Sequence, residues 1–81
     1  MSKRHQLLSD IDFKKDPAKW DHLLSEKQRT KAGIKTLSKV LPIPEGSNEV
    51  RLIKVLQGKY RYVSVEEYSY LIKAFDMLPN K

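Results

Sequence analysis

Apolar residues recur along most of this chain at intervals of three and four, which is the spacing of an amphipathic helix. The first such segment follows Asp16-Pro17, a pair typical of helix starts because Asp caps free N–H groups and Pro fits the first turn. Gly33 is a stop signal after it. The pattern predicts a helix at 17–31, with these residues on one face: Trp20, Leu23 and Leu24. Trp20 is expected to anchor this helix against the core.

A second, shorter apolar pattern follows Gly33 and predicts a helix at 34–41, with Ile34, Leu37, Val40 and Leu41 at helical spacing. Pro42 and Pro44 forbid its continuation, because proline has no N–H group and clashes with the preceding turn. The segment PIPEGS is therefore expected to be an extended connector. Gly46 or Ser47 can cap the element after it.

The segment SNEVRLIKVLQ, residues 47–57, sorts its residues better as a helix than as a strand. Alternation would leave neither face cleanly apolar. At about 100° per residue, one side instead gathers Leu52, Ile53, Val55 and Leu56. The other side gathers Ser47, Val50, Arg51, Lys54 and Gln57. Gly58 is expected to end this helix.

Ser64-Val65-Glu66-Glu67 matches a capping box and predicts the start of a last helix. The segment before it, residues 59–63, is expected to be an extended loop, and residues 78–81 a short tail. Tyr70 is expected to lie off the inner stripe of the last helix. That stripe consists of Val65, Tyr68, Leu71, Ile72 and Phe75.

The predicted fold is all-α, a small bundle of four to five short helices. An α+β fold with a β-hairpin at about 50–65 stays open as an alternative, because Gly58 can form a turn between residues of high strand propensity. Residues 16–77 are expected to form a single domain. Residues 1–15 are expected to be a basic N-terminal arm or a short helix carrying Leu7, Leu8 and Ile11.

Size and charge restrict the function. A chain of 81 residues buries only about 60% of its unfolded surface, which favours a binding module over an enzyme with an enclosed cleft. The net charge of +6 favours a polyanionic partner such as nucleic acid or, less often, an anionic membrane surface. The chain has no cysteine and no long apolar run. We expect a soluble cytoplasmic protein without a membrane partner.

The positive charge is concentrated in two stretches that contain no acid. Residues 27–44 include five cations, and residues 50–65 include four. Because these stretches lie on either side of one predicted turn, they can form a single positive face. Two separate, solvated basic surfaces are the alternative.

The run LIKVLQGKYRYVSVEEYSYLIKAFDM resembles the second half of the lambda-repressor/Cro-like helix-turn-helix domain. In that family the recognition helix ends in a pattern like L-N-G-K-R, a loop leads to a capping Ser, and the next helix ends in A-K-A-hydrophobic-G. The corresponding residues here are Leu56-Gln57-Gly58-Lys59, Ser64 and Leu71-Ile72-Lys73-Ala74-Phe75. Upstream, Leu37-Ser38-Lys39-Val40-Leu41 is similar to the L-A-x-x-L of the family's second helix. The resemblance covers residues 34–77.

Two features depart from that family pattern. The family usually joins its second and third helices by a tight turn around Gly, whereas this chain has the longer PIPEGS. Ile34 occupies the position where the family often carries a phosphate-contacting Gln.

The resemblance implies a small transcriptional regulator, such as a repressor, that binds double-stranded DNA and is of the size that bacteriophages and mobile elements often encode. A homodimer on two half-sites is a further expectation. The expected base contacts are Ser47, Asn48, Arg51 and Lys54. The expected phosphate contacts are Lys35, Lys39, Lys59, Arg61 and Tyr62.

The tyrosines support a second hypothesis from a different class. Tyr60 and Tyr62 can cover the core with their hydroxyls in water, or stack on single-stranded nucleic acid. Together with Trp20 they can also form an aromatic surface. The alternative function is therefore a protein-interaction module or inhibitor that docks on a host protein.

Catalysis finds no support in the sequence. His5 and His22 are the two histidines, and they are not at a metal-ligand spacing. The chain has no phosphate-binding loop and no nucleophile motif. We expect a protein that is not an enzyme, with no cofactor, no metal and no catalytic residue.

Overall fold

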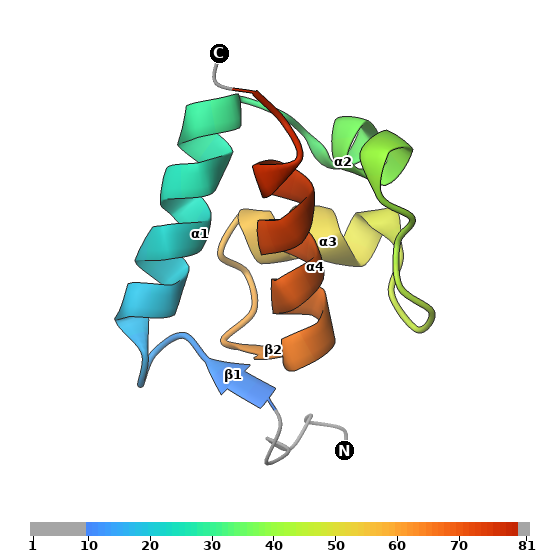
Figure 1. The fold of residues 1–81 in the computed structure, drawn as a ribbon. Coiled ribbons are helices and arrows are strands. Elements are labelled where there is room, and N and C mark those ends of the chain that lie inside the picture. Colours follow the sequence, from blue (N-terminus) through green and yellow to red (C-terminus); the bar gives the residue numbers. More distant parts are fainter. Residues whose placement is uncertain (1–9, 80–81) are drawn as a thin grey trace.

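Six elements follow one another along residues 10–79, the part of the chain that the computed structural model describes. They are β1 (Asp10–Asp12), α1 (Pro17–Thr30), α2 (Ile34–Val40), α3 (Glu49–Leu56), β2 (Tyr62–Ser64) and α4 (Val65–Asp76) (Figure 1). The predicted helical fold is confirmed: the protein is a compact, mostly helical domain with four helices. To these it adds a small two-stranded antiparallel sheet.

The sheet differs from the hairpin considered at 50–65, and that alternative is wrong. Residues 49–56 are helical, and β2 pairs with β1, so that Ile11 lies opposite Val63. Both of these side chains are buried, and this burial offsets the weak strand propensity of the flanking aspartates. Ile11 therefore lies in a strand and not in the short helix suggested for the N-terminal arm. Leu7 and Leu8 of that prediction lie outside the described residues.

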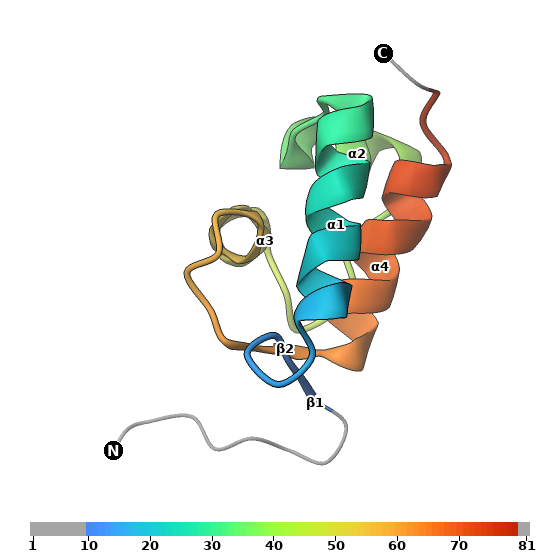
Figure 2. The ribbon, with the colours of Figure 1, turned by 90° about the vertical axis from the view of Figure 1, so that its left-hand side faces the viewer.

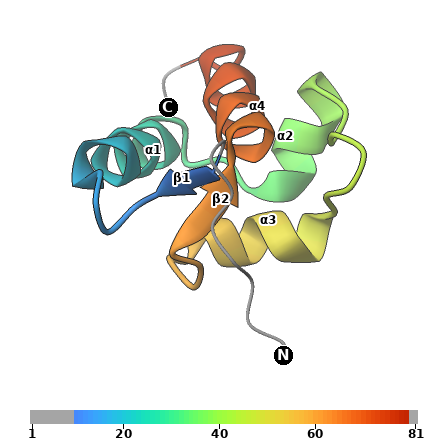
Figure 3. The same cartoon turned by 90° about the horizontal axis from the view of Figure 1, so that it is seen from below.

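The helices α1 and α4 lie side by side and run in the same direction (Figure 1). The strands β1 and β2 cross the end of the domain at which these two helices begin (Figure 1). The helix α3 lies on one side of this pair, seen end-on in Figure 2 and lengthwise in Figure 3. The core lies between the four helices and the small sheet, and its fully buried side chains are mostly aliphatic: Leu23, Leu37, Leu52, Val55, Val63, Leu71 and Phe75.

Because α1 and α4 are parallel, their C-terminal ends meet at one end of the domain (Figure 1). Arg29, in the last turn of α1, bridges these ends. Its guanidinium donates to the carbonyls of Phe75 at 2.8 Å and Leu78 at 3.2 Å, and it pairs with Glu26 on its own helix. A cation is favourable here because both helix dipoles place negative charge at this end.

The helix ends are partly as predicted. Asp16 is the N-cap of α1, but its side chain accepts no capping hydrogen bond, and Pro17 alone marks the start as expected. The predicted stop at Gly33 is wrong, because α1 ends at Thr30 and Lys31 adopts the left-handed conformation (φ 58°). Gly58 follows the end of α3 with φ 77°, which confirms it as the stop.

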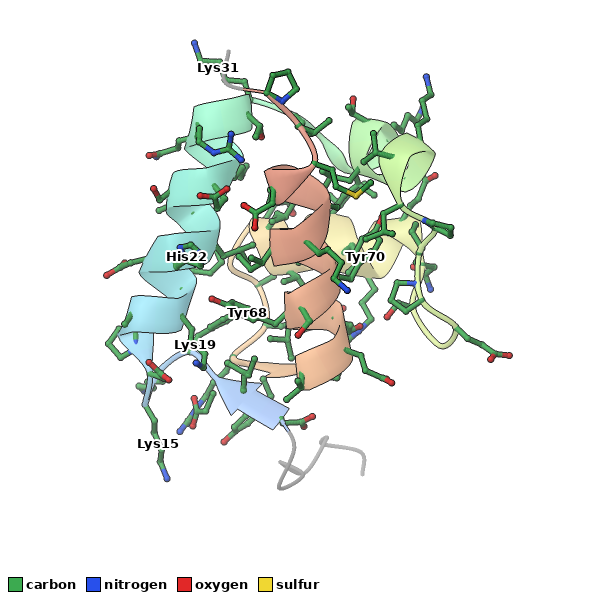
Figure 4. The ribbon with its side chains drawn as sticks, in the orientation of Figure 1. Lys15, Lys19, His22, Lys31, Tyr68 and Tyr70 are labelled. Carbon is green, nitrogen blue, oxygen red and sulfur yellow. The ribbon has the colours of Figure 1, made fainter. Side chains whose placement is uncertain are left out.

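The capping box at the start of α4 is confirmed: Ser64 and Glu67 exchange both hydrogen bonds. The predicted inner stripe is only partly right, since Leu71 and Phe75 are buried but Val65 is exposed. Tyr70, expected off the stripe, is buried and donates to the Leu41 carbonyl at 2.8 Å, while Tyr68 donates to the Lys19 carbonyl at 3.2 Å. The two tyrosines thus face opposite neighbours, as Figure 4 shows.

Candidate nucleic-acid interface

One face of α3 is turned to solvent along its whole length. The opposite face is buried through Leu52, Val55 and Leu56, as the sequence predicts. Ile53, predicted among these buried residues, is 40% exposed, because it lies at the edge of that face. Five residues of α3 and its C-cap are exposed, namely Glu49, Val50, Ile53, Lys54 and Gln57. We call the four of these that carry no negative charge the outward face: Val50, Ile53, Lys54 and Gln57.

The start of α3 is fixed by Asn48, and not by Gly46 or Ser47 as predicted. The Asn48 Oδ1 accepts a hydrogen bond of 2.8 Å from the Arg51 backbone N–H. Asn48 is exposed, as a base contact requires. Its oxygen, however, is already engaged, and a bidentate pair with adenine uses both the oxygen and the nitrogen of the amide.

A buried carboxylate, Glu67, joins the three segments around α3. It accepts from the Ser47 hydroxyl at 2.7 Å, from the Ser64 backbone N–H at 3.1 Å and from two nitrogens of the Arg51 guanidinium. Ser47 belongs to the connector before α3, and Ser64 caps α4. This cluster of four residues, the Glu67 cluster, therefore fixes α3 against the start of α4.

Electrostatics within the Glu67 cluster are strong. Burial alone would raise the pKa of Glu67, but the hydrogen bonds from Arg51, Ser47 and Ser64 outweigh it and lower the pKa from 4.5 to about 2. The same pair raises the pKa of Arg51. Glu67 is therefore ionised, and Arg51 charged, at neutral pH.

The position of Arg51 differs from the one that the sequence suggested. Its side chain was expected on the solvent side of the helix, ready for a guanine. In the structure it is bound to Glu67 and its Cζ lies 4.7 Å from the centre of the Tyr60 ring. Ser47 is engaged with the same carboxylate. A base contact by either side chain would have to break these hydrogen bonds.

Arg61 is the second predicted contact that is engaged within the fold. It forms two hydrogen bonds of 2.9 Å with Asp12, and its Cζ lies 5.0 Å from the centre of the Tyr62 ring. The hydrogen bond from Arg61 is the main cause that lowers the pKa of Asp12 to about 2. The side chain of Arg61 is 43% exposed, whereas the Asp12 carboxylate that it binds is buried. Tyr62 is half-buried beneath Arg61.

The predicted lysines, in contrast, are exposed. Lys35 and Lys39 lie on α2, Lys54 on α3 and Lys59 just after α3. Lys27 was not among the predicted contacts. Its Nζ donates to the Leu56 carbonyl, which brings a further cation to the end of α3. Lys27, Ile53 and Gln57 share a shallow hollow with the start of α2.

Sequence reasoning placed Val50 and Gln57 on the outer side of α3 but did not include them in the site. Their helical position was the available signal. The sequence predicted for Glu67 only a role in capping α4. Its contacts with Ser47 and Arg51 were missed because they join residues far apart in the chain.

Searches against protein-family models, curated proteins and solved structures found no match to this chain. Within residues 10–79, no helix is long and apolar enough to cross a membrane. The same residues contain no group of three or more His, Cys, Asp or Glu side chains that could hold a metal ion.

Proposed function

We propose that this protein binds double-stranded DNA through the outward face of α3, as a small transcriptional regulator of the Cro-like kind. The observation that carries the proposal is this exposed helix, whose outward face holds no acid between Val50 and Gln57. Glu49, at the N-terminal edge, is the one exposed acid of α3. A helix of eight residues is about 12 Å long, which suits a major groove about 12 Å wide.

The exposed residues of the outward face offer complementary contacts to base edges. Lys54 can donate to guanine, and Gln57 can pair with adenine. Val50 is 62% exposed, and with Ile53 it presents methyl groups of the kind that contact the methyl group of thymine. Val50 and Ile53 are thus apolar side chains left exposed on one turn of a surface helix.

Arg51 and Ser47 act in this proposal as positioning residues. Through Glu67 they hold α3 against α4, so that the outward face is presented at a fixed angle. Lys35, Lys39 and Lys59 are assigned to phosphates, where a lysine needs only proximity and charge. Arg61 and Tyr62 remain candidate phosphate contacts only through the part of their stacked pair that is exposed to solvent.

Fluorescence anisotropy tests the proposal, with a selected duplex pool, a random duplex and a random single strand at low and physiological salt. A selected duplex is expected to bind more tightly than the random one at the higher salt. Changing Lys54 and Gln57 to Ala should remove about 1–3 kcal/mol of this preference per lost contact. Lys39→Ala should weaken all duplexes alike and reduce the salt slope by about 1.

Lys73→Ala is the matched control, because Lys73 is an exposed lysine of α4, away from the outward face. It removes one charge, as the Lys54 change does, and should leave the preference intact. The proposal fails if selection enriches no sequence, or if the enriched duplex binds equally well to the Lys54 and Gln57 variant.

A further inference from the structure

A second surface of the protein is hollowed and aromatic. It is an open hollow of about 620 Å³ between the turn that follows β1 and the loop that joins α3 to β2. Phe13, Trp20 and Tyr60 line it, and Lys14, Lys59 and Arg61 surround them. We call this site the aromatic hollow. It shares no lining residue with the outward face of α3.

The walls of the aromatic hollow are held by the fold. The rings of Phe13 and Trp20 pack 5.4 Å apart at 59°, and the Phe13 backbone N–H donates to the Arg61 carbonyl at 3.0 Å, which ties the two walls together. Gly58 forms the floor beside Trp20: a Cβ there would lie 3.5 Å from the indole. With φ 77°, Gly58 also holds a turn that other residues rarely adopt.

The charge around the aromatic hollow has one sign. Lys14 and Lys59 are exposed, and no acid is among the residues that line the site. Asp12 lies close by but is buried and bound to Arg61. The carboxylate of Asp16, which follows the lining residue Lys14 closely in sequence, is exposed and pairs with Lys19 at 3.6 Å. An apolar cavity with a cationic rim fits an apolar group that has negative charges beside it.

We propose that the aromatic hollow receives an aromatic or aliphatic side chain from an acidic peptide segment of a partner protein. The Phe13 and Trp20 rings are tilted by 59° to each other, and the Arg51 guanidinium already lies over the Tyr60 ring, so the three rings do not form a set of parallel, open faces on which successive nucleobases could stack. Buried aromatic anchors inside a polar rim are the usual centre of a peptide interface. The chain's own first nine residues carry Lys3 and Arg4 but no acid, so their charge does not complement the rim.

Trp20 makes the proposal directly testable, because it is the single tryptophan of the chain. The probe is a synthetic peptide with one central Phe or Leu between runs of Asp and Glu, titrated while the Trp20 fluorescence is followed. Two matched peptides serve as controls: one has Ser at the centre with the same charge, and the other has Lys in place of each acid. A single-stranded oligothymidylate is titrated in the same way.

Two charge-reversal variants locate the site on the full-length protein. Lys14→Glu with Lys59→Glu inverts the rim, and Lys35→Glu with Lys39→Glu makes the same change in net charge on α2. All four side chains are exposed, and circular dichroism checks that both variants fold. The rim variant should lose at least about tenfold in affinity for the acidic peptide. The α2 variant should stay within about threefold at physiological salt, since screening limits distant charges.

The result expected is a saturable Trp20 response to the Phe or Leu peptide that is lost with the Ser peptide and with the rim variant. Three results would overturn the proposal: equal binding of the Ser peptide, tighter binding of the oligothymidylate at Trp20, or no saturable response to any acidic peptide. No duplex DNA is present, so these outcomes are independent of the function proposed for α3.

Discussion

Two arginines of this protein are held in the same way, yet their surroundings differ. Arg51 and Arg61 each pair with a carboxylate and lie over a tyrosine ring. Glu67, however, also accepts from a distant hydroxyl and from a helix cap, so that it joins three segments. Asp12 adds only the N–H groups of its own turn, at Lys14 and Lys15. The first pair positions a helix, and the second closes a turn and a strand pair.

The difference predicts unequal effects when each carboxylate is replaced by its amide. Glu67→Gln should lower the free energy of unfolding by about 2–3 kcal/mol, since a buried carboxylate that satisfies three partners is lost. Asp12→Asn should cost less, because Arg61 is more exposed and water can solvate it. Urea denaturation of both variants measures the difference, with Glu66→Gln, an exposed neighbour, as control. An equal loss would contradict the comparison.

Acid should act on both pairs. In the unfolded chain the pKa of Asp and Glu side chains is about 4. In the folded protein the pKa of Asp12 and that of Glu67 are both about 2. Both groups therefore contribute stability that is fully present above about pH 5 and is lost as the pH falls toward 2. For Glu67 this contribution is on the order of 3 kcal/mol.

Urea midpoints measured between neutral pH and pH 2 test that expectation. Glu67→Gln should give a flatter profile over this window than the unsubstituted protein, because a titrating group has been removed. Parallel profiles would show that Glu67 titrates alike in the folded and unfolded chains.

Replacing the tyrosine rings should have the smallest effect on the free energy of unfolding. Tyr60→Leu should cost about 0.5–1 kcal/mol through the lost contact with the Arg51 guanidinium. Tyr62→Leu should cost less, since Arg61 lies nearer the surface. A double-mutant cycle between Tyr60→Leu and Arg51→Gln isolates the ring contact from the other roles of Tyr60. A coupling energy of zero would assign the cost of Tyr60→Leu to packing alone.

Local signals accounted for most of the fold that the sequence predicted. The capping box at Ser64 and the stop at Gly58 depend on residues within a few positions of one another, and both are confirmed. β1 was missed because three residues, two of them aspartates, form a strand only through a partner about fifty positions away. The face of α4 was misjudged at Tyr70 because this helix packs on both α1 and α2.

For the candidate site, too, local features could be predicted from the sequence and contacts between distant residues could not. The solvent side of α3 could be read from helical spacing, which placed Val50, Lys54 and Gln57 correctly outward. The engagement of Arg51 and Arg61 could not, since each depends on a carboxylate brought close only by the fold. Whether these residues contact DNA stays a prediction.

The way the fold uses its arginines has a consequence for recognition. All three arginines within residues 10–79, namely Arg29, Arg51 and Arg61, are bound to carboxylates, and Arg29 also binds helix carbonyls. The forked guanidinium group, which reads guanine or grips phosphate with two parallel hydrogen bonds, is thus committed internally. Apart from Arg61, the exposed cations of residues 10–79 are lysines, whose compact ammonium group has no fixed fork of donors. In the proposed DNA complex the base contacts of the described residues therefore come from the Lys54 ammonium, the Gln57 amide and the methyl groups of Val50 and Ile53, and none of them uses a guanidinium fork.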